Sequence, residues 1–318
     1  MQDTDAKFVS IAGSGRTGST LLSLLISQAP SSFNLGQMRD FFGAYAANAP
    51  CTCGCALQHC PVWSSVVSHA YGPDSLSVLA SMHAAVARFA EVANQVEHWG
   101  RPKLLPRLAE SQRNYLDRLR AFLRSVVVVT GARVLVDASK SPEIAFASKL
   151  AGMPDVRVVN LVRDPRAVAV SWMNKRGEGM ALNQITAMWL RQRRIDQWSS
   201  LLGRSLGMLR YEDFAESPQR LVGEIFAWME EPMPSNLFSS ASEAEVSWSS
   251  QHLYPPANER VLAQRLEAVR IEPAEAWQDA RYASLHREIE SRFAPLLARL
   301  NYVRSLCDEP SAVGAYRP

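Results

Sequence analysis

The sequence has no long uninterrupted hydrophobic run and no strong excess of charge of one sign. No apolar stretch reaches the roughly 18 residues that a helix needs to cross a bilayer, so we expect no membrane span. The 34 basic and 31 acidic residues leave a net charge of only +3, which argues against a general affinity for nucleic acid. The opening stretch MQDTDAKFVSIAG is acidic and enters a strand-like segment almost at once. We therefore expect a cytoplasmic protein.

Cysteine is scarce outside one short stretch, CTCGCALQHC. Four of the five cysteines stand there, at Cys51, Cys53, Cys55 and Cys60. A zinc site usually shows a second pair of ligands a dozen or more residues away, and this cluster lacks that second half. Redox pairing is also disfavoured in a cytosolic chain. We interpret the stretch as a tight structural turn with reduced thiols, keep metal binding as a less favoured alternative, and expect no metal.

Three units of strand, loop and helix can be read along the chain. In each, a short β-prone apolar segment leads through a loop into a helix: residues 8–12 and then 21–27, residues 133–137 and then a helix from Pro142, and residues 157–162 followed by RDPRAVAVSWMNKR. Strands that alternate with helices predict an α/β fold with a parallel sheet flanked by helices. Ligands of such sheets bind beyond the carboxyl ends of the strands, so the three loops should meet at one edge.

The segment between the first and second units predicts a helical insertion. Residues 76–128 are rich in Ala, Leu and Val at helical spacing, and the insertion should cover about residues 44–130. Further helices are expected at residues 181–202, 218–229 and 274–300, and a strand at residues 206–210. With 318 residues, 47% of them apolar, we expect a single domain over residues 1–304 and a flexible tail over residues 305–318.

The first loop, GSGRTGST from Gly13 to Thr20, nearly satisfies the phosphate-loop pattern GxxxxGK[ST] but lacks its lysine. In nucleoside triphosphatases that lysine reaches the β and γ phosphates, so Ser19 in its place weakens an interpretation as a kinase or ATPase. An anion cradle remains, because small residues let backbone N–H groups converge at a helix N-terminus. Arg16 is the one cation in the loop that can replace the lysine.

The third loop offers a second phosphate site. Arg163 stands at the end of the expected strand, and Ser171 follows eight residues later, about two turns into the next helix. A guanidinium presents a fork of donors that matches phosphate oxygens, and a nearby hydroxyl adds a neutral hydrogen bond.

These two loops together resemble those of sulfotransferases that use 3'-phosphoadenosine 5'-phosphosulfate (PAPS). GSGRTGSTLL is similar to the family's 5'-phosphosulfate loop, and LVRDPRAVAVS is similar to its 3'-phosphate motif with Arg163 and Ser171 in register. Arg210-Tyr211-Glu212-Asp213, followed by Pro218, resembles the segment whose tyrosine lies beside the nucleotide. The resemblance implies a phosphate-loop type of fold and PAPS as the donor substrate.

Two further stretches resemble the tyrosylprotein and carbohydrate sulfotransferase branch and its bacterial members. In DASKSP, Lys140 stands where that branch carries a lysine near the transferring sulfuryl group. SSQHLYPPAN resembles a late loop in which Ser249 or Ser250 would contact the phosphosulfate and Asn258 would shape the loop. Pro255 stands where that loop usually has lysine, so one contact to the 3'-phosphate is either lost or supplied by Arg260. The CxCG and CPxW pattern around the cysteines also matches bacterial members.

The resemblance is weakest at the general base. LGQM places Gln37 where the branch commonly has a glutamate, and an amide cannot accept the proton. Asp40 and His252 are candidates for that role, and each is also consistent with an ordinary polar residue.

The resemblance therefore implies a bacterial, PAPS-dependent sulfotransferase that acts on a hydroxyl of a small molecule, carbohydrate, lipid or tyrosine and releases adenosine 3',5'-bisphosphate (PAP). Arg16, Lys140, Ser249 and Ser250 are the expected catalytic residues. The residues expected to bind the donor are Ser14, Gly15, Arg16, Thr17, Gly18, Ser19, Thr20, Arg163, Ser171, Tyr211, Asn258 and Arg260. Two alternatives remain open: a kinase-like phosphotransferase, and an inactive relative that binds PAP or PAPS. The sequence predicts neither the acceptor nor the oligomeric state.

Overall fold

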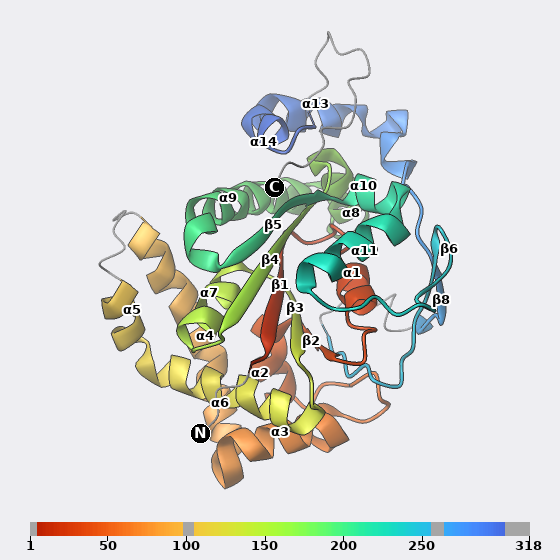
Figure 1. Ribbon diagram of the computed structural model, residues 1–318. Coiled ribbons are helices and arrows are strands. Elements are labelled where there is room, and N and C mark those ends of the chain that lie inside the picture. The colour runs from red at the N-terminus through yellow and green to blue at the C-terminus, as the bar shows by residue number, and fades with distance from the viewer. Residues whose placement is uncertain (1–4, 98–104, 256–263, 303–318) are drawn as a thin grey trace. The chain divides into compact units, whose positions relative to one another are not determined.

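Five strands form a parallel sheet in the order β2-β3-β1-β4-β5 in the computed structural model, which describes residues 5–97, 105–255 and 264–302 (Figure 1). All four neighbouring pairs are parallel. The strands are β1 (Lys7–Gly13), β2 (Ser32–Gly36), β3 (Val134–Lys140), β4 (Asp155–Val162) and β5 (Arg204–Arg210). The α/β class and the parallel sheet flanked by helices are confirmed.

The central strands are buried on both faces. Only the first residue of β1 and β4 and the last residue of β3 escape full burial. A parallel strand covered on both sides reads as a nearly continuous apolar run, which is why FVSIA and RVVNLV were recognisable in the sequence. The edge strand β5 is half-exposed to exposed along its length.

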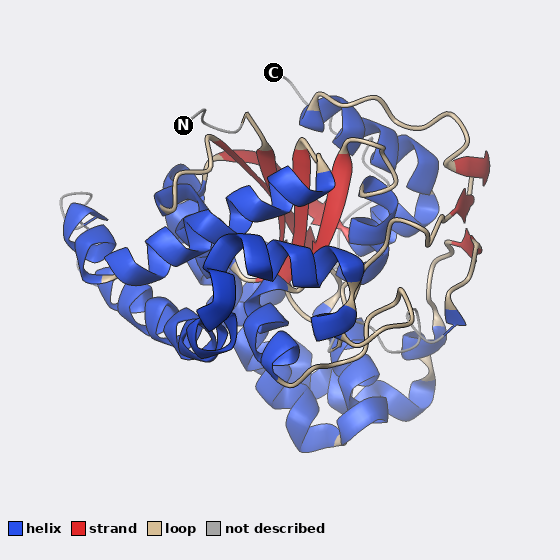
Figure 2. Cartoon of the chain, turned by 90° about the horizontal axis from the view of Figure 1, so that it is seen from below, coloured by secondary structure: helices blue, strands red, loops and turns tan. Residues whose placement is uncertain are grey.

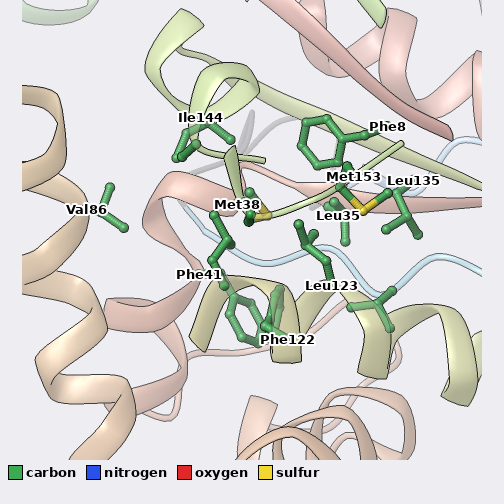
Figure 3. Packing of buried hydrophobic residues seen from close by; sticks show 14 of the residues in the cluster. Phe8, Leu35, Met38, Phe41, Val86, Phe122, Leu123, Leu135, Ile144 and Met153 are labelled. Atoms are coloured by element: carbon green, nitrogen blue, oxygen red, sulfur yellow. The ribbon is translucent and has the colours of Figure 1, made fainter. Parts of the chain in front are cut away.

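Alternate residues of the strands pack into two separate cores. Phe8, Leu35 and Leu135 face one core, where Figure 3 shows them gathered with Phe41 and Phe122 from the helices. Their strand neighbours, such as Val9 and Val136, face the other core. On that second side lie α1 (Ser19–Ile26) and α11 (Pro218–Met229), whereas α7 (Pro142–Leu150) lies on the first side (Figure 1).

The expected helical insertion is a set of helices between β2 and β3 that packs on the Phe8 side of the sheet. These elements are α2 (Met38–Ala46), η1 (Leu57–His59), α3 (Pro61–Tyr71), η2 (Gly72–Asp74), α4 (Ser75–Glu97), α5 (Leu105–Ser111) and α6 (Arg113–Thr130). The exact limits of the insertion and of the single domain stay predictions. The expected tail over residues 305–318 lies outside the described residues.

One helix departs from the expectation that no segment is apolar enough to cross a membrane. Ser75–Ala93 of α4 passes a test of length and composition, with a mean hydropathy of 1.3, and 28% of that window is buried. Its buried side chains include Leu79, Met82, Val86 and Phe89, which recur every three or four residues and pack into the protein core. Such spacing is typical of an amphipathic helix that packs on a protein core. The length and apolar composition of α4 are therefore weak evidence for a membrane-spanning helix.

The chain divides into two compact units, Met1–Arg163 with Leu190–Ala274, and Asp164–Trp189 with Glu275–Pro318. The helix α9 (Glu178–Leu202) passes from the second unit to the first. The second unit contains α8 (Pro165–Arg176), η4 (Ala276–Gln278), η5 (Ala280–Tyr282), α13 (Ala283–Arg292) and α14 (Ala294–Arg299). Within it, Arg166 pairs with Asp164 at 2.7 Å and with Glu290 at 2.7 Å.

One sequence expectation about secondary structure was wrong, and one small sheet was missed. The single helix expected at residues 274–300 is broken into η4, η5, α13 and α14. The last break is at Phe293, and α14 begins at Ala294 with Pro295 in its first turn. A three-stranded antiparallel sheet of β6 (Phe238–Ser240), β7 (Glu243–Glu245) and β8 (Ala268–Arg270) had not been predicted (Figure 2). Strands of three residues are too short for an alternating pattern to show.

Candidate functional site

The register of the parallel sheet brings five loops to one edge. Gly13 at the end of β1 pairs with Leu161, Ala12 pairs with Lys140, and Val162 pairs with Arg210. The carboxyl ends of the strands are therefore level, and the loop after each one projects beyond the same edge. This edge carries the phosphate-type loop, which runs from Gly13 to Thr20. It also carries the segments that begin at Gln37, Lys140, Arg163 and Tyr211.

The loop after β1 has a backbone that few side chains would allow. Gly13 has a φ of 131°, and a Cβ there would lie 2.2 Å from the carbonyl oxygen of Leu161. Arg16 adopts a φ of 70°, and Thr17 Oγ1 donates to the Ser14 carbonyl at 2.8 Å. The hydroxyl of Ser14 is buried and has no hydrogen-bond partner within the described chain. A buried hydroxyl and converging amides at the start of α1 suit an anion.

Tyr211 and Arg163 close one side of this loop. A Cβ on Gly18 would lie 2.8 Å from the ring of Tyr211, so the ring rests directly against the loop. The guanidinium of Arg163 stacks 4.3 Å from the centroid of that ring, and its Nη1 donates to the Arg16 carbonyl at 3.1 Å. Arg163 Nε is buried without a partner among the residues described. The structure thus brings Arg16, Gly18, Arg163 and Tyr211 together.

A group of cations lies beside the loop. Lys140 adopts a φ of 60°, and its Nζ donates to the Ala138 carbonyl at 2.9 Å. Burial and the nearby charges of Arg39 and Arg191 lower the pKa of Lys140 to about 8, although Asp137 and Asp40 oppose that shift. Burial and Arg39 also lower the pKa of Arg191, whose Nη1 donates to the Gly13 carbonyl at 3.3 Å. Positive groups held this close together are stabilised by a bound anion.

Arg39 and Arg191 were missed by sequence reasoning. Arg39 immediately follows the apolar start of α2, and Arg191 stands among other arginines of RQRR, so neither has a local signal. Their positions depend on how α2 and α9 pack.

Asp137 joins the elements that carry this site through hydrogen bonds. The sequence analysis did not identify it as a site residue. It is fully buried and accepts hydrogen bonds from Ser10 Oγ at 3.1 Å, from the Met38 amide at 3.2 Å and from the Ser139 amide and hydroxyl. Burial raises its pKa. These bonds join β1, β3 and the first turn of α2, so Asp137 sets where Gln37 and Lys140 lie. An acid inside the apolar run RVLVD was the available signal.

Gln37 and Asp40 stand at the start of α2. Gln37 is buried just before the helix, and Asp40 is in its first turn. One carboxylate oxygen of Asp40 accepts from Arg39 Nε at 3.4 Å, while the other is buried without a partner in the part of the chain that the structure describes.

Ser249 is anchored near the far end of α1 rather than at this loop. Ser249 is exposed, and its Oγ lies 2.9 Å from the Oγ of Ser247. The Ser247 amide donates to Gln28, just beyond the C-terminal end of α1. The length of α1, about 12 Å, separates this end from the phosphate-type loop. Ser250 is exposed. Ser171 belongs to the second unit, so its pairing with Arg163 stays a prediction. Asn258 and Arg260 lie outside the described residues. His252 has its Nδ1 3.2 Å from Cys60 Sγ, among the cysteines.

Comparison with known proteins gives a family match. A model of the sulfotransferase family matches residues 9–235. Among solved structures, the sulfotransferase domain of the Synechococcus PCC 7002 olefin synthase is 18% identical with a TM-score of 0.47, and the match covers 87% of this chain and 89% of that domain. The sulfotransferase domain from the curacin biosynthetic pathway is 18% identical with a TM-score of 0.43, covering 72% and 76%. A Mycobacterium avium sulfotransferase is 16% identical with a TM-score of 0.42, covering 73% and 66%. No curated protein matches the chain.

We predict that the strained backbone of the loop makes Gly13 far less replaceable than another glycine with positive φ. Gly131, with a φ of 68°, has nothing within 4 Å of the position that a Cβ would take, so Gly131→Ala should cost only the conformational penalty of about 1–2 kcal/mol. Gly13→Ala adds a clash with the backbone of β4 and should destabilise the protein by clearly more. Chemical denaturation of both variants measures this, and equal losses would contradict the account.

Proposed function

The chain belongs to the sulfotransferase family, and we propose that it transfers the sulfuryl group of PAPS to a hydroxyl of an acceptor and releases PAP. The observation that supports this most is the convergence of an anion-binding loop with Lys140, Arg191 and Arg163 at one sheet edge. The donor carries phosphates at both the 5' and the 3' positions and therefore needs cations in more than one place.

The 5'-phosphosulfate would lie in the loop. Its oxygens would accept hydrogen bonds from the backbone amides of Gly15 to Thr20 and from the buried hydroxyl of Ser14, which has no partner among the described residues. Arg16 would donate to the phosphate and to the transferring group. Ser14, Gly15, Thr17, Ser19 and Thr20 are proposed as donor-binding residues on this ground.

The 3'-phosphate would bind Arg163. Stacking on Tyr211 and the bond to the Arg16 carbonyl orient this guanidinium, and its buried Nε remains available for a phosphate oxygen. Ser171 is proposed as the second donor to the same phosphate.

Lys140 would stabilise the leaving group. The acceptor oxygen attacks sulfur in line, a new S–O bond forms, and the bond from sulfur to the bridging oxygen breaks with its electron pair going to the phosphate. Negative charge then gathers on that bridging oxygen. A charged Lys140 placed there counters this charge in a site where burial excludes water.

Asp40 is the base that the geometry favours. Gln37 cannot accept a proton, and His252 is engaged with Cys60. Asp40 lies close enough to Lys140 for their charges to interact, and it keeps one buried oxygen without a partner among the described residues. The hydroxyl proton of the acceptor would move to that oxygen as the S–O bond forms.

We also propose that the enzyme is bacterial and works in the cytoplasm. The motif resemblance to bacterial members supports the first point, and Cys51, Cys53, Cys55 and Cys60 form no disulfide, which suits a reducing compartment. The acceptor would be a small molecule, carbohydrate, lipid or tyrosine.

Nucleotide preference tests the proposal against a kinase-like activity. PAP at about 100 times its Kd should stabilise the protein by roughly 2.7 kcal/mol and raise its melting temperature, whereas ATP with magnesium should not. Arg163→Ala should abolish most of the shift, and Arg113→Ala on the exposed face of α6 should retain it. A shift with ATP alone would favour the kinase. Binding of PAP without turnover of PAPS on phenols, sugars, lipids and tyrosine peptides would favour an inactive relative.

The pH profile tests Lys140. Because its pKa is about 8 and the charged form is needed, kcat/KM should fall above that pH, by about tenfold for each further pH unit. Lys140→Arg keeps the charge and should remove this fall, whereas exposed Lys149→Arg should leave it unchanged. A fall of the same size in Lys140→Arg would rule out Lys140 as its source.

The base assignment predicts that Asp40→Asn lowers kcat by about 100-fold to 10,000-fold while PAP binding is retained. Adding Gln37→Glu to that variant should restore part of the rate, because it supplies a carboxylate at the same helix start. Steady-state kinetics with a turned-over acceptor and calorimetry with PAP measure the two effects, with exposed Asp117→Asn as control. Full activity in Asp40→Asn would exclude this residue as the base.

A further inference from the structure

Three cysteines and a histidine gather in a cluster that the proposed reaction does not use. The Sγ atoms of Cys51, Cys53 and Cys60 and a ring nitrogen of His252 all lie within 4.8 Å of one another. Cys51 Sγ is 3.8 Å from Cys60 Sγ, and Cys60 Sγ is 3.2 Å from His252 Nδ1. Cys51, Cys60 and His252 are buried, and Cys53 is partly buried.

These distances match the edges of a tetrahedron around zinc. Zinc binds thiolate sulfur at about 2.3 Å and imidazole nitrogen at about 2.0–2.1 Å, which places two sulfur ligands about 3.8 Å apart and a sulfur and a nitrogen about 3.5 Å apart. The observed separations of 3.8 and 3.2 Å therefore need only a small adjustment to hold an ion.

Backbone amides donate hydrogen bonds to all three sulfurs. The Sγ of Cys51 accepts from the Cys53 amide, and the Sγ of Cys53 accepts from the Cys55 amide. The Sγ of Cys60 accepts from the amides of Val62 and Trp63 in the first turn of α3. Hydrogen bonds from N–H groups to sulfur stabilise its negative form and orient it, as the outer partners of a metal site do.

The histidine is fixed against the cysteine turn by residues on either side of it. Thr52 Oγ1 donates to the Gln251 carbonyl at 2.8 Å and accepts from the Leu253 amide at 2.8 Å. The Thr52 amide donates to the Leu253 carbonyl at 2.9 Å. The residues that alternate with these, Cys51, Cys53 and His252, are the ones that point into the cluster. The four ligands are therefore positioned by backbone contacts before any ion binds.

We propose that Cys51, Cys53, Cys60 and His252 bind one zinc ion in a closed tetrahedral site that fastens residues 251–254 to the cysteine turn. Three thiols lose their protons to solvent on binding, and the neutral imidazole contributes Nδ1. All four positions around the ion are filled by protein, so the ion has a structural role. Sulfur and imidazole ligands in this geometry favour zinc over magnesium or calcium, which prefer oxygen.

The ion would fix the position of residues 252–254 beside β2. Tyr254, two residues after His252, donates its hydroxyl to the Leu35 carbonyl at 2.6 Å, just before Gly36 and Gln37. The imidazole itself stacks on Phe33 of β2, with ring centroids 6.4 Å apart. Fixing His252 therefore fixes the chain that packs along β2.

A disulfide is the main competitor for these sulfurs. Cys51 and Cys60 are 3.8 Å apart, whereas a disulfide needs about 2.05 Å, so the sulfurs would have to move together. A disulfide would also leave Cys53 and His252 without a role in the cluster.

Metal analysis of the purified full-length protein tests the proposal without any activity assay. Elemental mass spectrometry should find about one zinc ion per chain, and intact mass should show no disulfide. Replacing the ion with cobalt(II) should give the visible absorption of a tetrahedral thiolate site. Absence of zinc after growth in zinc-supplemented medium, or a mass lower by two hydrogen atoms, would overturn the proposal.

Variants assign the ligands. Cys60→Ser and His252→Ala should each reduce zinc to less than about a tenth of an ion per chain, whereas Cys55→Ser should retain about one, because Cys55 is exposed and outside the cluster. If a ligand variant does not fold, removal of zinc from the unmodified protein with a chelator should lower its melting temperature, and zinc should restore it. Full zinc content in Cys60→Ser, or no change in melting temperature after zinc removal, would contradict the assignment.

Discussion

The parallel pairing of β1 with β3 and β4 is the constraint on which the site depends. Because Ala12 is level with Lys140 and Gly13 is level with Leu161, the loop after β1 has the lysine on one side and Arg163 on the other. A shift of register would separate these groups. The same pairing buries both faces of the strands, so the apolar interior that stabilises the sheet also fixes the spacing of the charges at its edge.

Burial strengthens the interaction of these charges with one another and with a bound anion. Lys140 and Arg191 are poorly solvated, and the charge of the partly exposed Arg39 acts on both, which is unfavourable for the protein alone and favourable once an anion is bound. Asp137 makes this arrangement possible, because its hydrogen bonds to Ser10, Met38 and Ser139 join two strands and a helix beneath the cations. In this account the edge binds the donor because the donor's negative charges relieve the repulsion between these cations.

The sequence predicted the local units well and the remote contacts poorly. Strands β1, β3 and β4 and the phosphate-type loop are carried by adjacent residues, so patterns of apolarity and glycine were enough to find them. Arg191 reaches the carbonyl of Gly13 from α9, and His252 reaches Cys60 across 192 positions. No local pattern contains such pairs. The cysteine stretch lacked a nearby second half, and His252, the fourth ligand of the proposed zinc site, stands in a segment that had been assigned to the donor.

The same remote packing moved some residues away from the proposed chemistry. Ser249 follows a segment that is anchored to the far end of α1. His252 contacts Cys60, and Thr52 binds its neighbours Gln251 and Leu253, whereas Asp40 is close enough to Lys140 for their charges to interact. A crystal structure with PAP bound tests the central claim most directly. The account predicts that its 5'-phosphate is held by the amides of Gly15 to Thr20 and its 3'-phosphate by Arg163. PAP bound elsewhere, with this edge empty, would contradict it.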